Sequence, residues 1–445
     1  MDNLLRRTVS TFSGVRIGST VRAGVKRLSV LDRVTAGMII KGVWWFRDGL
    51  DGRRLRDGLV RLLQSRPWLA GRLTAEGVVY DAEGEVPFVE SSLPECRAET
   101  VLAESNALDR FAHPLSVAAF RRGQASPLTV SLVHVSDGAL LYVQGAHVCM
   151  DGSSFYGMMA DWARLCRGEA IEPVEAACRL TDPDFADDPA PAAHAEACGY
   201  VRVGWRVLAR IMWNTLCGLS RRRFAVRLTG EQVAGLIERV NARLGTHYGR
   251  HVVLSALLAA AEVRLGGLDA GVACRHVSVV NLRGRMAGIP LRFDGNAVYN
   301  IVSPVFSSSD KVEVVAGMID RTLRSLFVNG GERLTEVMRC YMSVIRDRLP
   351  YVPFDVGGMY ARRSPVSYVN DFLGFSVYAL DFGTGTPAAV LPPDLPDKVR
   401  LWPLPPQQGG GVEILFTGWL AGRWARCGDP LALLTALSEG KEPLG

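Results

Sequence analysis

The hexapeptide His147-Val-Cys-Met-Asp151-Gly152 joins a strand-like run, residues 138–146, to a helix-like run, residues 154–163. A histidine at the end of a strand can face a cleft, and an aspartate four residues later can fix the turn behind it. The glycine lets the backbone pass tightly into the helix. This arrangement is typical of a general base that takes a proton from an attacking nucleophile. A lone histidine beside apolar strand residues is more often structural, so the rest of the chain must decide.

Length and composition indicate a large globular protein. A chain of 445 residues suggests two or three domains, and 48% hydrophobic with 22% charged residues allows a sizeable core. The net charge of +6 is modest and shows no concentrated polybasic block, so we expect no nucleic-acid partner. A mildly basic surface would favour an anionic partner, although charge alone does not name it.

The nine cysteines are scattered singly, without the spacing of a zinc site, so the sequence predicts no metal. Their odd number and wide spacing favour reduced thiols in a cytoplasmic protein. Cys149 could be a nucleophile beside His147. A reactive thiol needs a lowered pKa, and nothing in the sequence predicts one there.

Periodicity predicts an α/β protein with mixed sheets, because strands and helices alternate in both halves. An acidic, proline-rich segment, residues 182–191, is the clearest linker. The helices are expected at residues 55–63, 152–165, 253–265, 312–327 and 334–345. The strands are expected at residues 77–80, 87–90, 128–135, 139–144, 277–282, 298–305, 376–380 and 411–416.

Residues 201–223 carry an amphipathic pattern. Apolar side chains repeat at helical spacing, arginines occupy another face, and three more arginines follow at the end of the segment. One interpretation is a helix that makes weak contact with a membrane surface. The other, which we favour, is a crossover helix packed on the domains, because amphipathic stripes usually face a core.

The first thirty residues are rich in arginine, serine and threonine, with no acidic residue between Asp2 and Asp32. This composition is similar to that of an organelle transit peptide. The alternative is that the first strand of the fold begins here. We therefore expect a cytoplasmic protein, with organelle targeting by the basic N-terminus as the open alternative.

Several spaced motifs occur in one order along the chain. They are Leu28-Ser-Val-Leu-Asp32, Pro67-Trp-Leu-Ala-Gly-Arg-Leu73, the hexapeptide with Trp162-Ala163 after it, Val280-Asn-Leu-Arg-Gly-Arg-Met286, Gly295-Asn-Ala-Val298, Asp381-Phe-Gly-Thr-Gly-Thr-Pro387 and Gly411-Val-Glu413. In this order the motifs resemble those of the acyl-CoA-dependent acyltransferases called BAHD, and they cover residues 28–436. The motif at residues 381–387 departs from the family pattern, because it has threonines where the family has tryptophan and lysine.

The resemblance implies two chloramphenicol-acetyltransferase-like domains, each a mixed sheet flanked by helices, with the active site in a channel between them. We expect an N-terminal domain over residues 1–185 that carries His147 and Asp151, and a crossover linker and helix over residues 186–225. A C-terminal domain over residues 226–445 would carry Arg283 and the Asp381-Phe382-Gly383 motif.

The resemblance also implies an activity: a monomeric enzyme of secondary metabolism moves an acyl group from acyl-CoA to a hydroxyl or amine of a small molecule. No cofactor is bound permanently, and acyl-CoA is a co-substrate. His147 is the general base, and no covalent acyl-enzyme forms. The sequence agrees with this last point, since it lacks the Gly-x-Ser-x-Gly elbow of a serine nucleophile.

The remaining site residues are assigned structural or binding roles. By resemblance, Asp151 points away from the substrate and pairs with an arginine of the second domain, for which we expect Arg283, with Arg285 as the alternative; an Asp151 that orients the imidazole would also be reasonable. Gly152, Asp381 and Gly383 are expected to hold the architecture. Two more residues stand where the family has an active-site Thr-Ser-Trp-like segment: Asn370, whose amide could stabilise an oxyanion, and Phe372, a substrate contact.

Two other classes stay open. One is a condensation or wax-ester-type acyltransferase that uses a carrier protein or a lipid. These commonly show two adjacent histidines, whereas Ala146 precedes His147 here. The other class is a non-catalytic relative that binds a ligand through a relic motif.

Overall fold

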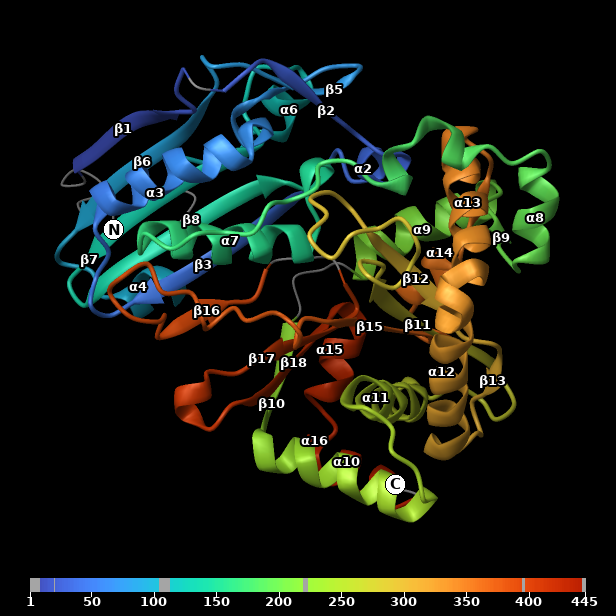
Figure 1. Cartoon of the computed structure of the whole chain (residues 1–445). Helices are drawn as coiled ribbons and strands as arrows, with labels where there is room; N and C mark the ends of the chain where they lie inside the picture. The colour runs from blue at the N-terminus through green and yellow to red at the C-terminus, as the bar shows by residue number, and fades with distance from the viewer. Residues whose placement is uncertain (1–8, 20, 104–112, 219–222, 394–396, 442–445) are drawn as a thin grey trace. The chain divides into compact units, whose positions relative to one another are not determined.

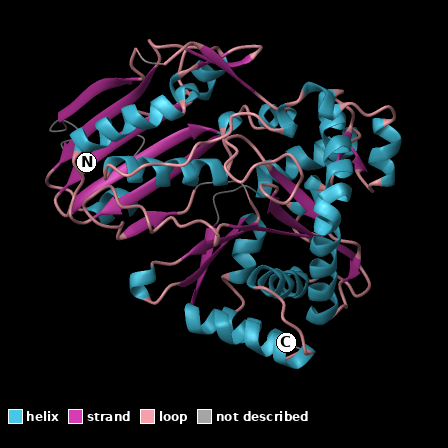
Figure 2. Ribbon diagram, in the orientation of Figure 1, coloured by secondary structure: helices cyan, strands magenta, loops and turns pink. Residues whose placement is uncertain are grey.

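The computed structural model describes residues 9–19, 21–103, 113–218, 223–393 and 397–441. Two compact units appear in the chain. Unit 1 contains residues 1–185, 288–297 and 375–394, and unit 2 contains residues 186–287, 298–374 and 395–445. Each unit is built on its own sheet with helices against it (Figures 1 and 2). The fold is therefore α/β with two mixed-sheet halves, as the sequence predicts.

Unit 1 is built on a six-stranded sheet. Its strand order is β1 (Val9–Arg16), β6 (Glu85–Leu93), β7 (Leu128–Val135), β8 (Gly138–Ala146), β3 (Ile39–Phe46) and β16 (Ala389–Leu391). The β6–β7 pair is parallel and the other pairs are antiparallel. Strand β8 lies in the middle and is buried along almost its whole length, as its near-continuous apolar run requires.

Two long helices of unit 1 pack on each other, α3 (Gly52–Ser65) and α7 (Gly152–Cys166). The apolar residues of α3 fall on one face because they recur every three to four positions. The shorter elements are α2 (Val30–Val34), α4 (Ala98–Ala103), α6 (Val117–Arg121), the 3₁₀ turns η1 (Pro67–Ala70), η2 (His147–Cys149), η3 (Arg179–Thr181) and η4 (Pro183–Ala186), and a small sheet of β2 (Gly24–Arg27), β5 (Gly77–Tyr80) and β4 (Arg72–Leu73).

Unit 2 is built on a second mixed sheet. Its order is β10 (Arg223–Thr229), β18 (Gly411–Thr417), β17 (Val399–Pro403), β15 (Val366–Asp371), β11 (Ala273–Asn281) and β12 (Val298–Val302), with β13 (Phe306–Ser307) paired to β11. The β11–β15 and β15–β17 pairs are parallel. A two-stranded ladder joins β9 (Val201–Arg202) to β14 (Tyr351–Val352).

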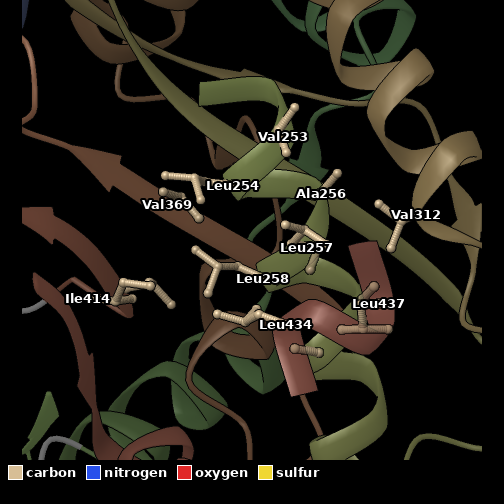
Figure 3. Close-up of a cluster of buried hydrophobic side chains, with 14 of the residues drawn as sticks. Val253, Leu254, Ala256, Leu257, Leu258, Val312, Val369, Ile414, Leu434 and Leu437 are labelled. Carbon is tan, nitrogen blue, oxygen red and sulfur yellow. The ribbon is translucent and has the colours of Figure 1, made fainter. Parts of the chain in front are cut away.

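The core of unit 2 forms around helix α11 (Arg250–Gly266), which is buried through most of its length. Figure 3 shows its leucines between Val369 and Ile414 of the sheet and Leu434 and Leu437 of α16 (Pro430–Ser438). The other helices are α8 (Pro191–Ala197), α9 (Trp205–Gly218), α10 (Gly230–Leu244), α12 (Val312–Phe327), α13 (Glu332–Arg346), α14 (Val356–Met359) and α15 (Gly418–Trp424), with 3₁₀ turns η5 (Val328–Gly331) and η6 (Pro406–Gln408).

Most predicted elements are confirmed, and one strand prediction is wrong. Residues 376–380 form turns, although their apolar side chains favoured a strand. The strand predicted at residues 277–282 is confirmed as β11, which ends at Asn281, and Arg283 and Arg285 lie in the turn that follows. Gly284 has a φ of 66° in this turn, which explains why the extended backbone stops there.

The two units also differ from a split of the chain into consecutive halves. Residues 288–297 and 375–394 come from the second half of the sequence but belong to unit 1. The second segment contributes β16, which extends the unit 1 sheet at β3 (Figure 1). The Asp381-Phe382-Gly383 motif, which we expected in the C-terminal domain, therefore lies in unit 1, whereas Arg283 lies in unit 2.

Candidate active site

The structure places His147 where the central strand β8 meets the helix α7. The residue opens the 3₁₀ turn η2, directly after the buried end of β8. Its backbone N–H donates to the carbonyl of Met38, at 3.0 Å, and its own carbonyl accepts from the N–H of Met150. The strand and the turn thus fix the backbone of the predicted base on two sides.

Asp151 fixes the turn behind His147. It is the N-cap residue of α7, and Oδ1 accepts the N–H of Ser154 at 2.9 Å. Oδ2 accepts the N–H of Ala297, also at 2.9 Å, from the loop of residues 288–297. Asp151 is only 1% exposed, and Gly152 follows it as the first residue of α7. These contacts give the aspartate a positioning role in unit 1.

The same loop contacts the His147 turn through Asn296. The side-chain Nδ2 donates to the carbonyl of His147 at 2.8 Å and to Oδ1 of Asp32 at 2.8 Å. The backbone N–H of Asn296 donates to the same Asp32 oxygen. Asp32 is fully buried, and its other oxygen accepts the N–H of Ser29 in a capping box of α2.

We call Asp32, His147, Asp151 and Asn296 the hub. Its members come from three sequence motifs that are more than a hundred residues apart. All three motifs are visible in the sequence, but no role for Asp32 or Asn296 was predicted from them. The presence of both residues in the motifs is the signal that could have identified them. The sequence does not show that the Asn296 amide connects Asp32 to the carbonyl of His147.

Burial, and not the charges of the hub, sets the charge state of His147. Burial lowers the pKa of its imidazole, and the nearby carboxylates of Asp151 and Asp32 only partly oppose this. The neutral ring is therefore the form present near pH 7. A neutral imidazole can accept a proton, which is the property required of a general base.

The two ring nitrogens of His147 differ in their surroundings. Nδ1 is buried and has no hydrogen-bond partner among the described residues. The residue's own carbonyl and the side chain of Asn296 raise the pKa of the ring, against the larger effect of burial. In a neutral imidazole one ring nitrogen carries the proton and the other keeps a lone pair, so the neutral ring of His147 can accept a substrate proton.

A buried ion cluster fastens the 288–297 loop to the helices of unit 1. Arg66, which is 1% exposed, donates to Asp161 of α7 at 2.5 Å and to Asp294 of the loop at 2.6 Å. Arg292 donates to Asp161 as well, and Lys26 donates to the carbonyl of Asp294. Removal of one partner would leave a buried charge uncompensated, so the cluster holds the loop in one position.

A family model described as the Transferase family matches residues 21–417, which is most of the chain. The chain belongs to this family, the BAHD acyltransferases. The predicted acyltransferase class is therefore confirmed at the level of the family.

Two curated relatives from rice, Oryza sativa subsp. japonica, align with almost the whole chain. Tryptamine hydroxycinnamoyltransferase 2 is 26% identical over 426 residues, which cover 88% of this chain and 89% of the relative. Tryptamine benzoyltransferase 1 is 26% identical over 415 residues, which cover 87% and 88%. Both names describe the transfer of an acyl group.

Solved structures share the fold at low identity. Vinorine synthase superposes with a TM-score of 0.66 at 17% identity, over 96% of this chain and 98% of that chain. TRI101 of F. graminearum complexed with coenzyme A and deoxynivalenol has a TM-score of 0.61 at 13% identity, over 91% of this chain and 98% of that chain. The first condensation domain of the calcium-dependent antibiotic synthetase has a TM-score of 0.56 at 16% identity, over 95% of this chain and 97% of that chain.

The BAHD Asp-Phe-Gly motif of this chain is a folded turn in unit 1. Oδ1 of Asp381 accepts the N–H groups of Gly383 and Gly385, at 2.7 and 2.9 Å. Both glycines have φ near 100°, which few other residues adopt. Phe382 is buried against Trp162, three turns of α7 or about 16 Å from the Asp151 end. These contacts are architectural.

Three predicted site residues belong to unit 2. Arg283 is 6% exposed, and its backbone N–H and Nη1 both donate to Oδ1 of Asn281, at 3.1 Å. Asn370 lies on β15, where its Nδ2 donates to Asp397 at 3.0 Å. Phe372 is buried beside Trp402. One N–H of the Asn370 amide is thus already used, and the Asp151–Arg283 pair stays a prediction.

Cys149 does not have the properties of a nucleophile. It is 1% exposed, and burial raises the pKa of its thiol to about 12. A thiol with so high a pKa holds almost no thiolate at neutral pH, and the thiolate is the reactive species. No group of three or more metal-binding side chains occurs among the described residues.

Proposed function

We propose that this BAHD family member transfers an acyl group from acyl-CoA to a hydroxyl or amino group of a small acceptor, with His147 as general base. The observation that carries the proposal is the hub. It holds the backbone of His147 at the end of β8, where burial lowers the pKa of the imidazole and Nδ1 is enclosed, and we assign Nε2 as the nitrogen that accepts the proton. General base catalysis of this kind supplies about 10²–10⁴-fold in rate.

The reaction needs two proton transfers and no covalent enzyme intermediate. The acceptor oxygen or nitrogen attacks the thioester carbonyl carbon while its proton moves to Nε2 of His147. The tetrahedral intermediate then collapses, the carbon–sulfur bond breaks, and the imidazolium returns its proton to the departing thiolate. The products are an ester or an amide and free coenzyme A. The raised pKa of Cys149 supports this direct route over an acyl-cysteine.

Three comparisons support the choice of substrates. The rice relatives are named for acyl transfer to tryptamine, which is an amine. TRI101 has been solved with coenzyme A and a mycotoxin, so this fold accepts coenzyme A together with a small acceptor. In the same proposal, Asp151 and Arg283 support the site, and Asn370 and Phe372 contact the intermediate or the acceptor.

The second candidate is a condensation-type or wax-ester-type acyltransferase that uses a carrier protein or a lipid. The fold alone does not separate it, since a condensation domain superposes over 95% of this chain. The identity of the acyl donor separates the two classes. A chain that accepts only carrier-bound acyl groups, and no acyl-CoA, would belong to this second class.

The test is to incubate the purified protein with a panel of acyl-CoAs and acceptors and to follow the release of free thiol. We expect acceptor-dependent release that His147→Ala lowers by about 10²-fold or more. His134→Ala is the matched control, because that histidine lies on β7 and pairs with Glu90 instead. Retained activity in His147→Ala would refute the role of the base. Binding of acyl-CoA without turnover by the wild type would indicate a non-catalytic relative.

A further inference from the structure

Helix α9 of unit 2 is attached through one face. Arg210 makes two hydrogen bonds of 2.6 Å to the carboxylate of Asp355, beside α14. Ile211 lies so close to α14 that a side-chain carbon built at Gly357 would be 3.1 Å from its Cγ1. The packed side of α9 is therefore the side of Arg210 and Ile211. The crossover helix is packed in part, as one of the two interpretations of the sequence expected.

The opposite side of α9 exposes large apolar side chains. The exposed fractions are 75% for Trp205, 52% for Leu208, 58% for Met212 and 68% for Trp213. At 100° per residue these four positions fall within an arc of about 140°. We call them the α9 apolar face. Large apolar side chains gathered on one exposed side of a helix indicate a surface that binds a partner.

The sequence around this face carries charges of one sign. Residues 201–223 contain six arginines, at positions 202, 206, 210, 221, 222 and 223, and no aspartate or glutamate. The net charge of the entire chain is also +6, so the rest of the sequence is balanced. The guanidinium of Arg206 lies 5.3 Å from the ring centre of Trp205, and Arg202 is exposed beside them. Arg210 pairs with Asp355, so the exposed Arg202 and Arg206 are the described charges that favour an anionic partner.

We propose that the α9 apolar face docks on an anionic phospholipid membrane, with the helix flat in the interface. Tryptophan favours the boundary between headgroups and acyl chains, and arginine binds the phosphates. A helix of 14 residues is about 21 Å long, against about 30 Å for the hydrocarbon core, so it lies on a bilayer. None of the described helices is long and apolar enough to cross a membrane.

A second copy of the chain fits this face less well. Two copies that met here would bring their arginines together without an acidic residue in the segment to offset them. An anionic membrane can contact both kinds of side chain, because its acyl chains accommodate the tryptophans and its phosphates bind the arginines. This proposal concerns location and is independent of the proposed acyl transfer.

The test uses the full-length protein and sedimented vesicles, either of phosphatidylcholine alone or of phosphatidylcholine and phosphatidylserine in equal parts. We expect binding to the mixed vesicles and little binding to the neutral ones. Trp205→Ala with Trp213→Ala should weaken binding by about tenfold or more, because two large side chains no longer insert. Arg206→Glu should weaken it by about fivefold or more.

A matched pair of leucines provides the control. Leu208→Ala and Leu291→Ala remove the same side chain from two exposed positions, and Leu291 lies in unit 1 at 77% exposure. Only Leu208→Ala should weaken vesicle binding, by about threefold or more. The substituted side chains are exposed, so circular dichroism should show that the variants remain folded.

Three results would each overturn the proposal. The first is equal vesicle binding of the wild type and the double tryptophan variant, and the second is no binding of the wild type to the mixed vesicles. The third is a wild-type dimer in light scattering that becomes a monomer in the double variant, which would make the face a contact between protein chains.

Discussion

Asn296→Ala tests whether the hub holds the candidate base in place. The substitution removes the side-chain amide that donates to Asp32 and to the carbonyl of His147, both at 2.8 Å. The backbone N–H of residue 296 still donates to Asp32, so the loop keeps one of its contacts. The variant therefore removes the bridge and leaves the rest of the hub in place.

The magnitude follows from the two lost bonds. A hydrogen bond to a buried carboxylate contributes about 1.5–3 kcal/mol to the free energy of unfolding, and one to a carbonyl about 0.5–1.5 kcal/mol. The side-chain Oδ1 of Asn296 is buried without a partner among the described residues, and alanine removes that penalty of about 1–3 kcal/mol. We expect a net loss of about 1–2 kcal/mol, which is about 5- to 30-fold in a local opening equilibrium.

The assay is hydrogen exchange of peptides that contain α2 and η2, read together with turnover. We expect exchange about tenfold faster in these two elements and a fall in kcat that exceeds the change in KM, because the imidazole is less firmly positioned. Asn300→Ala is the matched control, since no described side-chain hydrogen bond involves that residue on β12. Exchange and kcat in Asn296→Ala that match the Asn300→Ala values would refute the reasoning.

Three further predictions follow from buried groups. Cys149→Ala should keep turnover within about threefold, and iodoacetamide should not label the wild-type thiol, since its pKa is about 12. Arg66→Met should lower the free energy of unfolding by about 3–5 kcal/mol in denaturant melts, because Asp294 loses its buried partner. Burial lowers the pKa of His276 to about 3 in the folded state. Below about pH 6.5 the unfolded state therefore binds a proton at this histidine, whereas the folded state stays neutral there. Stability should therefore fall as pH drops from about 6.5 towards 3, and His276→Asn should flatten this dependence in melts across that range.

The regular elements could be predicted from the sequence because their signals are local. The apolar stripe of α3 and the run of β8 depend on residues close together in the chain. The capping box formed by Thr229 and Gln232 at the start of α10 likewise depends on residues only three positions apart. The same kind of signal failed at residues 376–380, whose apolar side chains pack from turns.

The hub could not be predicted from local signals. Asn296 contacts Asp32 across 264 positions, and nothing near either residue specifies the other. The placement of residues 288–297 in unit 1 depends on Arg66, Lys26 and Asp151, which are equally remote in sequence. The motifs identified the residues, and only the packing assigned their partners.

The pH dependence of kcat tests the central claim most directly. The proposed base is active when neutral, and burial lowers the pKa of His147 below its ordinary value of about 6.5. We predict that kcat rises with a midpoint below about pH 6.5 and is level at pH 7 and above, and that His147→Ala loses this step together with the rate. A midpoint well above pH 7, or the same profile in His147→Ala, would contradict the claim that a neutral His147 takes the proton.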